Sequence, residues 1–150
     1  LCAEPRLMEP IYLVEVLTPH NGEYFVRQIL SKRRGKVISV KPLLGTTLKV
    51  LMAEVPLIDS FGMEVDMRAK TQGQAFALSF FYRWGLVPGD PLKSSIVLRP
   101  LEPSPDFALA REFVVKSRRR RGQSEEVDLS KYVNEDQIIE IASLYDQPDF

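Results

Sequence analysis

The stretch D-M-R-A-K-T-Q-G-Q-A-F, from Asp66 to Phe76, contains the pattern T-x-G-x-A, which could cradle a phosphate or connect a helix to a strand. A phosphate-binding loop places its glycines after a strand and before a helix, so that backbone N–H groups meet the anion. Here the order is reversed, because Gly73 follows a helical pattern and precedes a strand pattern. We therefore predict a turn, with Gly73 as a left-handed helix cap.

Other residues that could support catalysis are scarce. The phosphate-binding pattern G-x-x-x-x-G-K-[ST] is absent. The single histidine, His20, and the single cysteine, Cys2, are too few for a zinc site, which needs about four ligands. His20 lies in a T-P-H-N-G turn without an identifiable nucleophile, so no catalytic triad is predicted. We expect this chain not to be an enzyme and to contain no catalytic, cofactor-binding or metal-binding residue.

Basic residues form the first candidate binding cluster at the end of a predicted helix. Lys32, Arg33 and Arg34 follow a helical pattern that starts at Glu23, and Gly35 after them fits the left-handed C′ position. Cations in the last turn compensate the negative end of the helix dipole, which is the role that we favour. Contact with a protein or RNA partner is the second candidate role for these three residues.

Arg118, Arg119, Arg120 and Arg121 form the second candidate cluster. Residues 91–123 carry 8 basic and 3 acidic side chains, whereas residues 124–150 carry 1 basic and 8 acidic ones. The arginines could remain solvated, bind the acidic residues that follow, or bind an external acidic surface or RNA. Because an exposed ion pair contributes only about 0–1 kcal/mol, we expect an external partner, with protein ahead of RNA.

The hydrophobic pattern predicts the element order β-α-β-β-α-β within residues 11–90. Strand patterns cover residues 11–17, 37–44, 48–55 and 76–84, and helical patterns start at Glu23 and near Asp59. Pro42 places the second strand at an edge. This order is that of the ferredoxin-like split βαβ fold, an α+β class with an antiparallel sheet and two helices.

Two apolar patterns suggest which side chains are buried. In the second helix, Phe61 and Val65 repeat at i,i+4, with Met63 and Met67 beside them. In the last strand, large side chains alternate with smaller or polar ones, so we expect its large residues to pack in the interior. These strand residues are Phe76, Leu78, Phe80, Tyr82 and Trp84.

Further segments flank the predicted domain. Residues 1–10 form a connector, and residues 91–106, with four of the 11 prolines, form an ordered linker. Residues 107–150 form a helical extension, basic then acidic, with helices over 107–121 and 135–145; the first docks through Leu109, Phe113 and Val114. The chain starts without methionine, so we expect it to be a piece of a longer protein. No apolar run approaches the roughly 20 residues that span a bilayer, so no membrane partner is expected.

Several segments resemble the last domain of the translocation-type GTPases, the elongation factor G and elongation factor two class. They are P-R-L-M-E-P-I-Y-L-V-E-V, S-K-R-R-G-K-V, D-S-F-G-M-E-V-D-M-R-A-K-T-Q-G-Q-A-F and W-G-L-V-P-G-D-P. The tail, with R-P-L-E-P and L-A-R-E-F, resembles the spliceosomal branch of that class, the elongation-factor-like GTPases of the U5 small nuclear ribonucleoprotein. The chain departs from the class in a short first loop and in Met63, where relatives often have phenylalanine.

The resemblance implies an interaction and allosteric module that acts in pre-mRNA splicing and spliceosome remodelling in the nucleus. It implies that GTP and magnesium bind the parent protein elsewhere, with no cofactor in this chain. The implied partners are a large spliceosomal scaffold protein, other U5 proteins, the parent's own domains and, as an alternative contact, U5 small nuclear RNA. The competing hypotheses are domain V of a ribosomal translocation factor, which R-P-L-E-P opposes, and a stand-alone enzyme.

Overall fold

The computed structural model describes residues 5–93, 95–99, 102, 104–126, 134 and 139 of the 150-residue chain. The described part divides into two compact units, one formed by Arg6–Val87 and a second that starts at Pro88. The predicted helix over 135–145 lies outside the described residues, apart from Ile139. None of the helices described is long and apolar enough to cross a membrane.

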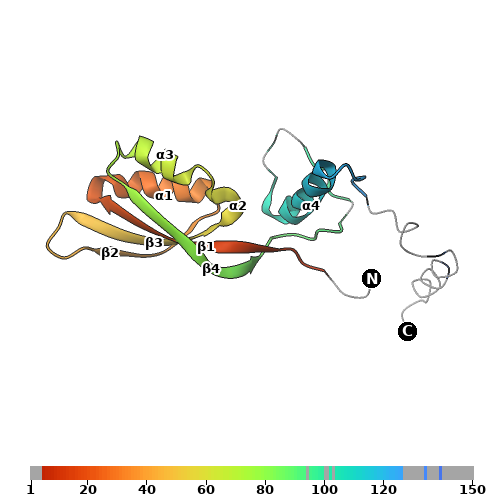
Figure 1. The fold of residues 1–150 in the computed structure, drawn as a ribbon, viewed down its shortest axis with the longest axis horizontal. Coiled ribbons are helices and arrows are strands. Elements are labelled where there is room, and N and C mark those ends of the chain that lie inside the picture. Colours follow the sequence, from red (N-terminus) through yellow and green to blue (C-terminus); the bar gives the residue numbers. More distant parts are fainter. Residues whose placement is uncertain are drawn as a thin grey trace. The chain divides into compact units, whose positions relative to one another are not determined.

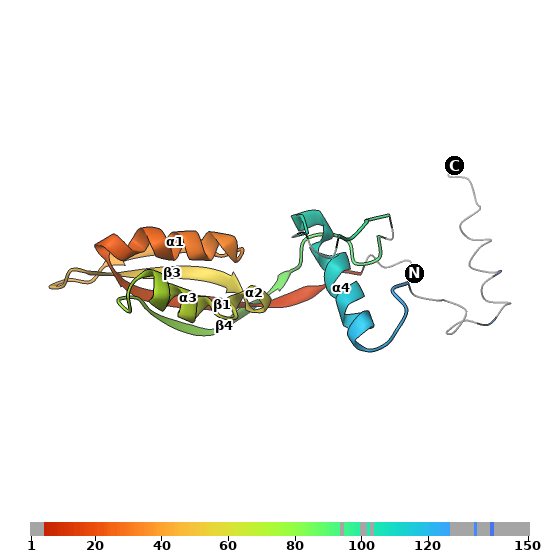
Figure 2. The same cartoon turned by 90° about the horizontal axis from the view of Figure 1, so that it is seen from above.

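The Arg6–Val87 unit contains a four-stranded antiparallel sheet with helices on one face (Figures 1 and 2). Its strands are β1 (Met8–Pro19), β2 (Lys36–Pro42), β3 (Leu48–Pro56) and β4 (Phe76–Leu86). Its helical segments are η1 (His20–Gly22), α1 (Glu23–Lys32), α2 (Leu57–Ser60) and α3 (Met63–Lys70). The spatial order β2-β3-β1-β4 and the connections are those of the ferredoxin-like fold, so the predicted α+β class is confirmed. β2, with Pro42, is an edge strand, as predicted.

The core lies between the sheet and the two longer helices, α1 and α3. Val14 and Val16 of β1 are fully buried. They pack with apolar residues of α1, β3 and α3. The largest fully buried side chains in this core are Val26, Leu30, Leu51, Val55, Met63 and Met67.

The second predicted helix is interrupted, and its buried stripe differs from the prediction. α2 ends at Ser60, the following Phe61 is extended, and Gly62, with the left-handed φ of 74°, is the N-cap residue of α3. Met63 and Met67 are buried at 1% exposure, whereas Phe61 and Val65 are 70% and 66% exposed. Phe61/Val65 and Met63/Met67 both have i,i+4 spacing, so the spacing alone does not tell which pair is buried. Because α3 starts only after the break at Gly62, its orientation about the helix axis places the methionines toward the sheet.

Both longer helices of this unit end with a left-handed residue. At the end of α3, the turn is confirmed, but the left-handed residue at C′ is Gln72, with φ 54°, and not Gly73 as predicted; Gly73 follows it with φ 79° and donates its N–H to the Arg68 carbonyl at 2.7 Å. At the end of α1, the left-handed residue is Arg34, with φ 54°, and not Gly35 as predicted. Gly35 is needed for another reason, because a Cβ there would lie 2.8 Å from the Leu30 carbonyl oxygen.

β4 does not have the buried aromatic face that its pattern predicts. Phe80, Tyr82 and Trp84 are 47%, 51% and 58% exposed. The pairing of β4 with β1 shifts register at Tyr82, so the residues on either side of this bulge do not share one face. Phe81 contacts Trp84 edge to face, with ring centroids 5.9 Å apart. Alternation separates the two faces of a strand, but it does not tell which face a helix covers.

The unit that starts at Pro88 contains a short helical turn, η2 (Asp106–Ala108), and the helix α4 (Leu109–Arg120). Within α4, Ala110, Arg111 and Val115 are buried. The predicted docking residues Leu109, Phe113 and Val114 are only half-buried. Residues 95–99 have no regular secondary structure.

Candidate interaction surfaces

Arg34 ties the end of α1 to β1 and α2. Its Nη1 and Nη2 donate to the two carboxylate oxygens of Glu9 at 2.8 and 2.9 Å, and its Nε lies 2.5 Å from Asp59 Oδ2. Glu9 is only 5% exposed. Burial lowers the pKa of Arg34, but the hydrogen bonds to Glu9 and Asp59 outweigh this effect and raise it above its ordinary value. This candidate binding residue is therefore engaged inside the unit.

Arg33 is also engaged inside the unit, whereas Lys32 is not. Arg33 Nη1 donates to the carbonyl oxygens of Asp59 and Phe61 at 2.9 and 2.7 Å, and Nη2 pairs with Asp66. Lys32 is exposed and makes no ion pair with any residue that the structure describes. Of the three candidates at the end of α1, Lys32 is the one whose charge is available to a partner.

A groove of about 480 Å³ lies beside this cluster, between α1, α2 and α3. Lys32 and Lys70, which has no ion pair within the described residues, contribute positive charge. Ile58 and Phe61, 48% and 70% exposed, add an apolar wall. The remaining lining residues are Gln28, Ile29, Arg33, Asp59 and Asp66.

Two arginines of the run at the end of α4 make side-chain contacts within the described residues, and the other two do not. Arg118 Nε donates to the Ser124 carbonyl at 2.6 Å, and its Nη2 donates to the Glu126 carbonyl at 3.2 Å. Arg119 Nε donates to Glu125 Oε1 at 2.7 Å. The predicted alternative of pairing with the acidic side chains that follow therefore accounts for Arg119 alone, because Arg118 contacts only backbone carbonyl oxygens.

Arg120 and Arg121 differ from the two preceding arginines in their side-chain contacts. Both are exposed, and neither makes a hydrogen bond or ion pair through its side chain with the residues that the structure describes. Their charges are therefore not neutralised within that part of the chain. They are the members of the run that remain candidates for an external partner.

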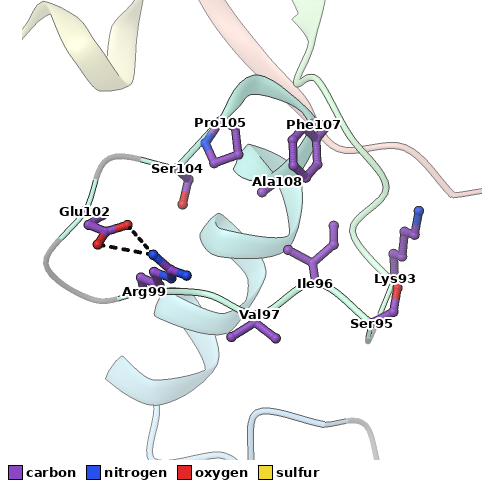
Figure 3. A pocket seen from close by; sticks show the side chains of 10 residues that line it. All are labelled: Lys93, Ser95, Ile96, Val97, Arg99, Glu102, Ser104, Pro105, Phe107 and Ala108. Atoms are coloured by element: carbon purple, nitrogen blue, oxygen red, sulfur yellow. Dashed lines mark hydrogen bonds and ion pairs between the residues drawn. The ribbon is translucent and has the colours of Figure 1, made fainter.

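A second hollow, of about 460 Å³, lies between residues 95–99 and the start of α4 (Figure 3). Ile96, Phe107 and Ala108 give it an apolar wall, and Arg99 pairs with Glu102 at its rim at 3.2 Å. Its shape and lining suit an apolar contact and offer no catalytic arrangement.

The sheet face opposite α1 and α3 is the feature that the sequence interpretation missed. We call it the open face and define its apolar part from the strand register: Leu13 and Leu17 of β1, Val50 and Met52 of β3, and Phe76, Leu78 and Phe80 of β4. The three β4 side chains are 53%, 54% and 47% exposed, and the other four are half-buried. No helix of the Arg6–Val87 unit covers this face (Figures 1 and 2).

Charged residues on the open face lie near these apolar side chains. Arg83 Nη2 donates to Glu54 Oε2 at 2.7 Å, and this hydrogen bond raises the pKa of Arg83 above its ordinary value. Glu15 lies between Met52 and Leu78 of the neighbouring strands and is half-buried. It makes no ion pair within the described residues.

The described residues contain no group of three or more His, Cys, Asp or Glu side chains that could hold a metal ion. The two units present four candidate interaction surfaces: an apolar sheet face, a mixed groove, an apolar hollow and a pair of exposed arginines. The fold and these surfaces define an α+β domain of the ferredoxin-like class with an additional helical unit.

Comparison with known proteins places this domain in a family. The family model "Elongation factor G C-terminus" matches residues 6–95, so the chain belongs to that family. The resemblance noted in the sequence is confirmed. The matched segment contains all four strands of the sheet and the helices packed on it.

Individual relatives are named as U5 small nuclear ribonucleoprotein components or as a pre-mRNA-splicing factor. The chain is 52% identical over 142 residues to each of two Arabidopsis thaliana proteins, the 110 kDa U5 small nuclear ribonucleoprotein component CLO and the 109 kDa U5 small nuclear ribonucleoprotein component GFL. It is 45% identical over 138 residues to the pre-mRNA-splicing factor cwf10 of Schizosaccharomyces pombe. These alignments cover 92–95% of the chain but only 14–15% of each relative.

Proposed function

We propose that this chain is the C-terminal interaction and allosteric module of a U5 small nuclear ribonucleoprotein GTPase, acting in pre-mRNA splicing in the nucleus. In this proposal, GTP and magnesium bind another part of the parent protein. The module contacts a large scaffold protein, other U5 proteins and the parent's own domains. It performs no chemistry itself.

One observation carries the proposal: the similarity to splicing proteins continues beyond the family domain. The family model ends at residue 95, which leaves 55 residues. The alignment with the 110 kDa component leaves out only 8 of 150 residues, so it includes at least 47 of those 55. α4 and the arginine run lie in this shared extension.

The second candidate function is domain V of a ribosomal translocation factor, because the matching family model is named after elongation factor G. The two functions predict that adding an excess of this chain to a cell-free extract inhibits different processes, splicing in one case and translation in the other. Added to a cell-free splicing extract, the chain should compete for the module's binding sites and inhibit splicing of a labelled pre-mRNA with increasing dose. Translation of a reporter should be unaffected at the same dose. Inhibition of translation with normal splicing would favour the ribosomal function.

The expectation that this chain binds no nucleotide gives a first prediction. Titration of the chain with GTP and magnesium should produce no calorimetric signal of binding tighter than about 1 mM, which corresponds to roughly −4 kcal/mol. The physical reason is that the T-x-G turn follows a helix, so no helix N-terminus faces a phosphate there. Binding in the micromolar range would contradict a module without nucleotide chemistry.

The outward arginines give a second prediction. Replacing Arg120 and Arg121 by alanine should abolish co-purification with the scaffold protein if protein is the partner, which we favour. If RNA is the partner, the same change should reduce the log–log salt dependence of binding by up to about 2 units, near one for each lost phosphate contact. The melting temperature should stay nearly unchanged, because both side chains are exposed.

The matched control for this prediction is the pair Arg118→Ala and Arg119→Ala, which removes internal contacts to residues 124–126. This control should weaken partner binding less than the outward pair does. If the Arg120→Ala, Arg121→Ala variant shows unchanged protein binding and unchanged salt dependence, these two arginines bind no partner and are only solvated.

A further inference from the structure

The open face is a continuous apolar surface, because its residues occupy neighbouring positions on three adjacent strands. Leu17 lies opposite Val50 of β3 on one side and Phe76 of β4 on the other, and Leu13 lies opposite Phe80. Soluble proteins rarely leave large contiguous apolar patches in water, and such patches mark interaction sites. This surface is therefore suited to a partner that removes it from solvent.

Glu15 restricts what that partner can be. It is half-buried, and its cross-strand neighbours are Met52 and Leu78. A partner that covers this face removes water from the Glu15 carboxylate, and a desolvated charge is costly unless it is paired. Glu15 makes no ion pair with any residue that the structure describes. We therefore expect the cation to come from the partner.

The composition of the face favours protein over RNA. A surface that stacks single-stranded bases combines aromatic planes with cations that are free to meet phosphates. Here the β1 and β3 positions are aliphatic or acidic, and Arg83 is already bound to Glu54. Lys36 and Lys41 lie on β2, the edge strand farthest from the exposed aromatic residues of β4.

We propose that the open face is a protein-docking surface whose partner presents apolar side chains and one lysine or arginine that pairs with Glu15. Docking buries the β4 side chains Phe76, Leu78 and Phe80, and the ion pair fixes the register of the partner on the sheet. This inference goes beyond the proposed function, since it identifies a surface and a partner chemistry whether the partner belongs to the spliceosome or to another assembly.

A photo-crosslinking experiment on the full chain tests the proposal. Benzoylphenylalanine replaces Phe80 on the open face or, as a control, Tyr24, which is 69% exposed on α1. Each variant is irradiated in whole-cell extract, and crosslinked peptides are identified by mass spectrometry. We expect the probe at position 80, and not the one at position 24, to capture a peptide of another protein with apolar residues beside a lysine or arginine.

Charge reversal then tests the role of Glu15. Glu15→Lys should reduce the crosslink yield at least about tenfold, because like charges at a desolvated contact cost several kcal/mol. Changing the captured lysine or arginine of the identified partner to glutamate should restore the yield with Glu15→Lys. Glu64→Lys, the same charge reversal on α3, should leave the yield within about twofold. Should Glu15→Lys fail to fold, Glu15→Gln provides the test, with an expected loss of at least about threefold.

Four results would overturn the proposal: no capture above the control at position 24, capture of RNA alone, capture of a second copy of this chain alone, or a yield that is insensitive to Glu15. The identity of the captured protein bears on the function separately. A ribosomal partner held through Glu15 would support the docking surface and contradict the splicing proposal.

Discussion

Replacing Leu51 by alanine should lower the free energy of unfolding by about 2–5 kcal/mol, measured by urea denaturation. Leu51 is fully buried on β3, the strand between β2 and β1, and the cavity left by its side chain would lie in the centre of the core. A loss of this size is a large part of the total stability of a domain, which is about 5–15 kcal/mol.

Phe80→Ala is the matched comparison for this prediction. The strand pattern alone predicts a cost of about 3–5 kcal/mol for this change, as for any core phenylalanine. Because Phe80 is 47% exposed on the open face, we expect less than about 1 kcal/mol. Equal losses for Leu51→Ala and Phe80→Ala would mean that the open face is covered within this chain.

Arg34→Ala should destabilise the chain by about 3–5 kcal/mol, because it leaves the Glu9 carboxylate buried without its partner. The substitution also removes the ion pair between Arg34 and the Asp59 carboxylate, which adds to the loss of stability. Lys32→Ala is the control on the same helix end and should change stability by less than about 0.5 kcal/mol.

A double variant separates the ion pair from general damage at this site. With Glu9→Gln in the background, no buried charge is left unpaired, so the further cost of Arg34→Ala should be smaller than in the unmodified chain. A single-variant cost below about 1 kcal/mol, or equal costs in both backgrounds, would contradict the internal role of Arg34.

The periodic apolar pattern was sufficient to predict the sheet and its helices. Val14 and Val16 of β1 are separated by the polar Glu15, and this alternation indicates a strand with one buried face. Pro42 correctly indicated an edge, because proline cannot donate to a neighbouring strand. These features depend on residues that are close in sequence.

The features that sequence reasoning missed depend on contacts across the chain. Arg34 meets Glu9 and Asp59, each 25 residues away, and nothing in the local pattern of α1 indicates those partners. The exposure of Phe80 depends on the absence of a helix over the open face, which alternation cannot report. The adjacent aromatic residues Phe80 and Phe81 interrupt the alternation of large and small side chains in β4, and this interruption was the one local sign of the bulge.

Affinity purification of the tagged chain from nuclear extract, followed by mass spectrometry and RNA quantification, tests whether this module belongs to the U5 small nuclear ribonucleoprotein. We expect enrichment of U5 small nuclear ribonucleoprotein proteins and U5 RNA over a tag-only control, without enrichment of ribosomal proteins. Enrichment of ribosomal proteins and ribosomal RNA, with U5 components at the level of the control, would contradict this expectation.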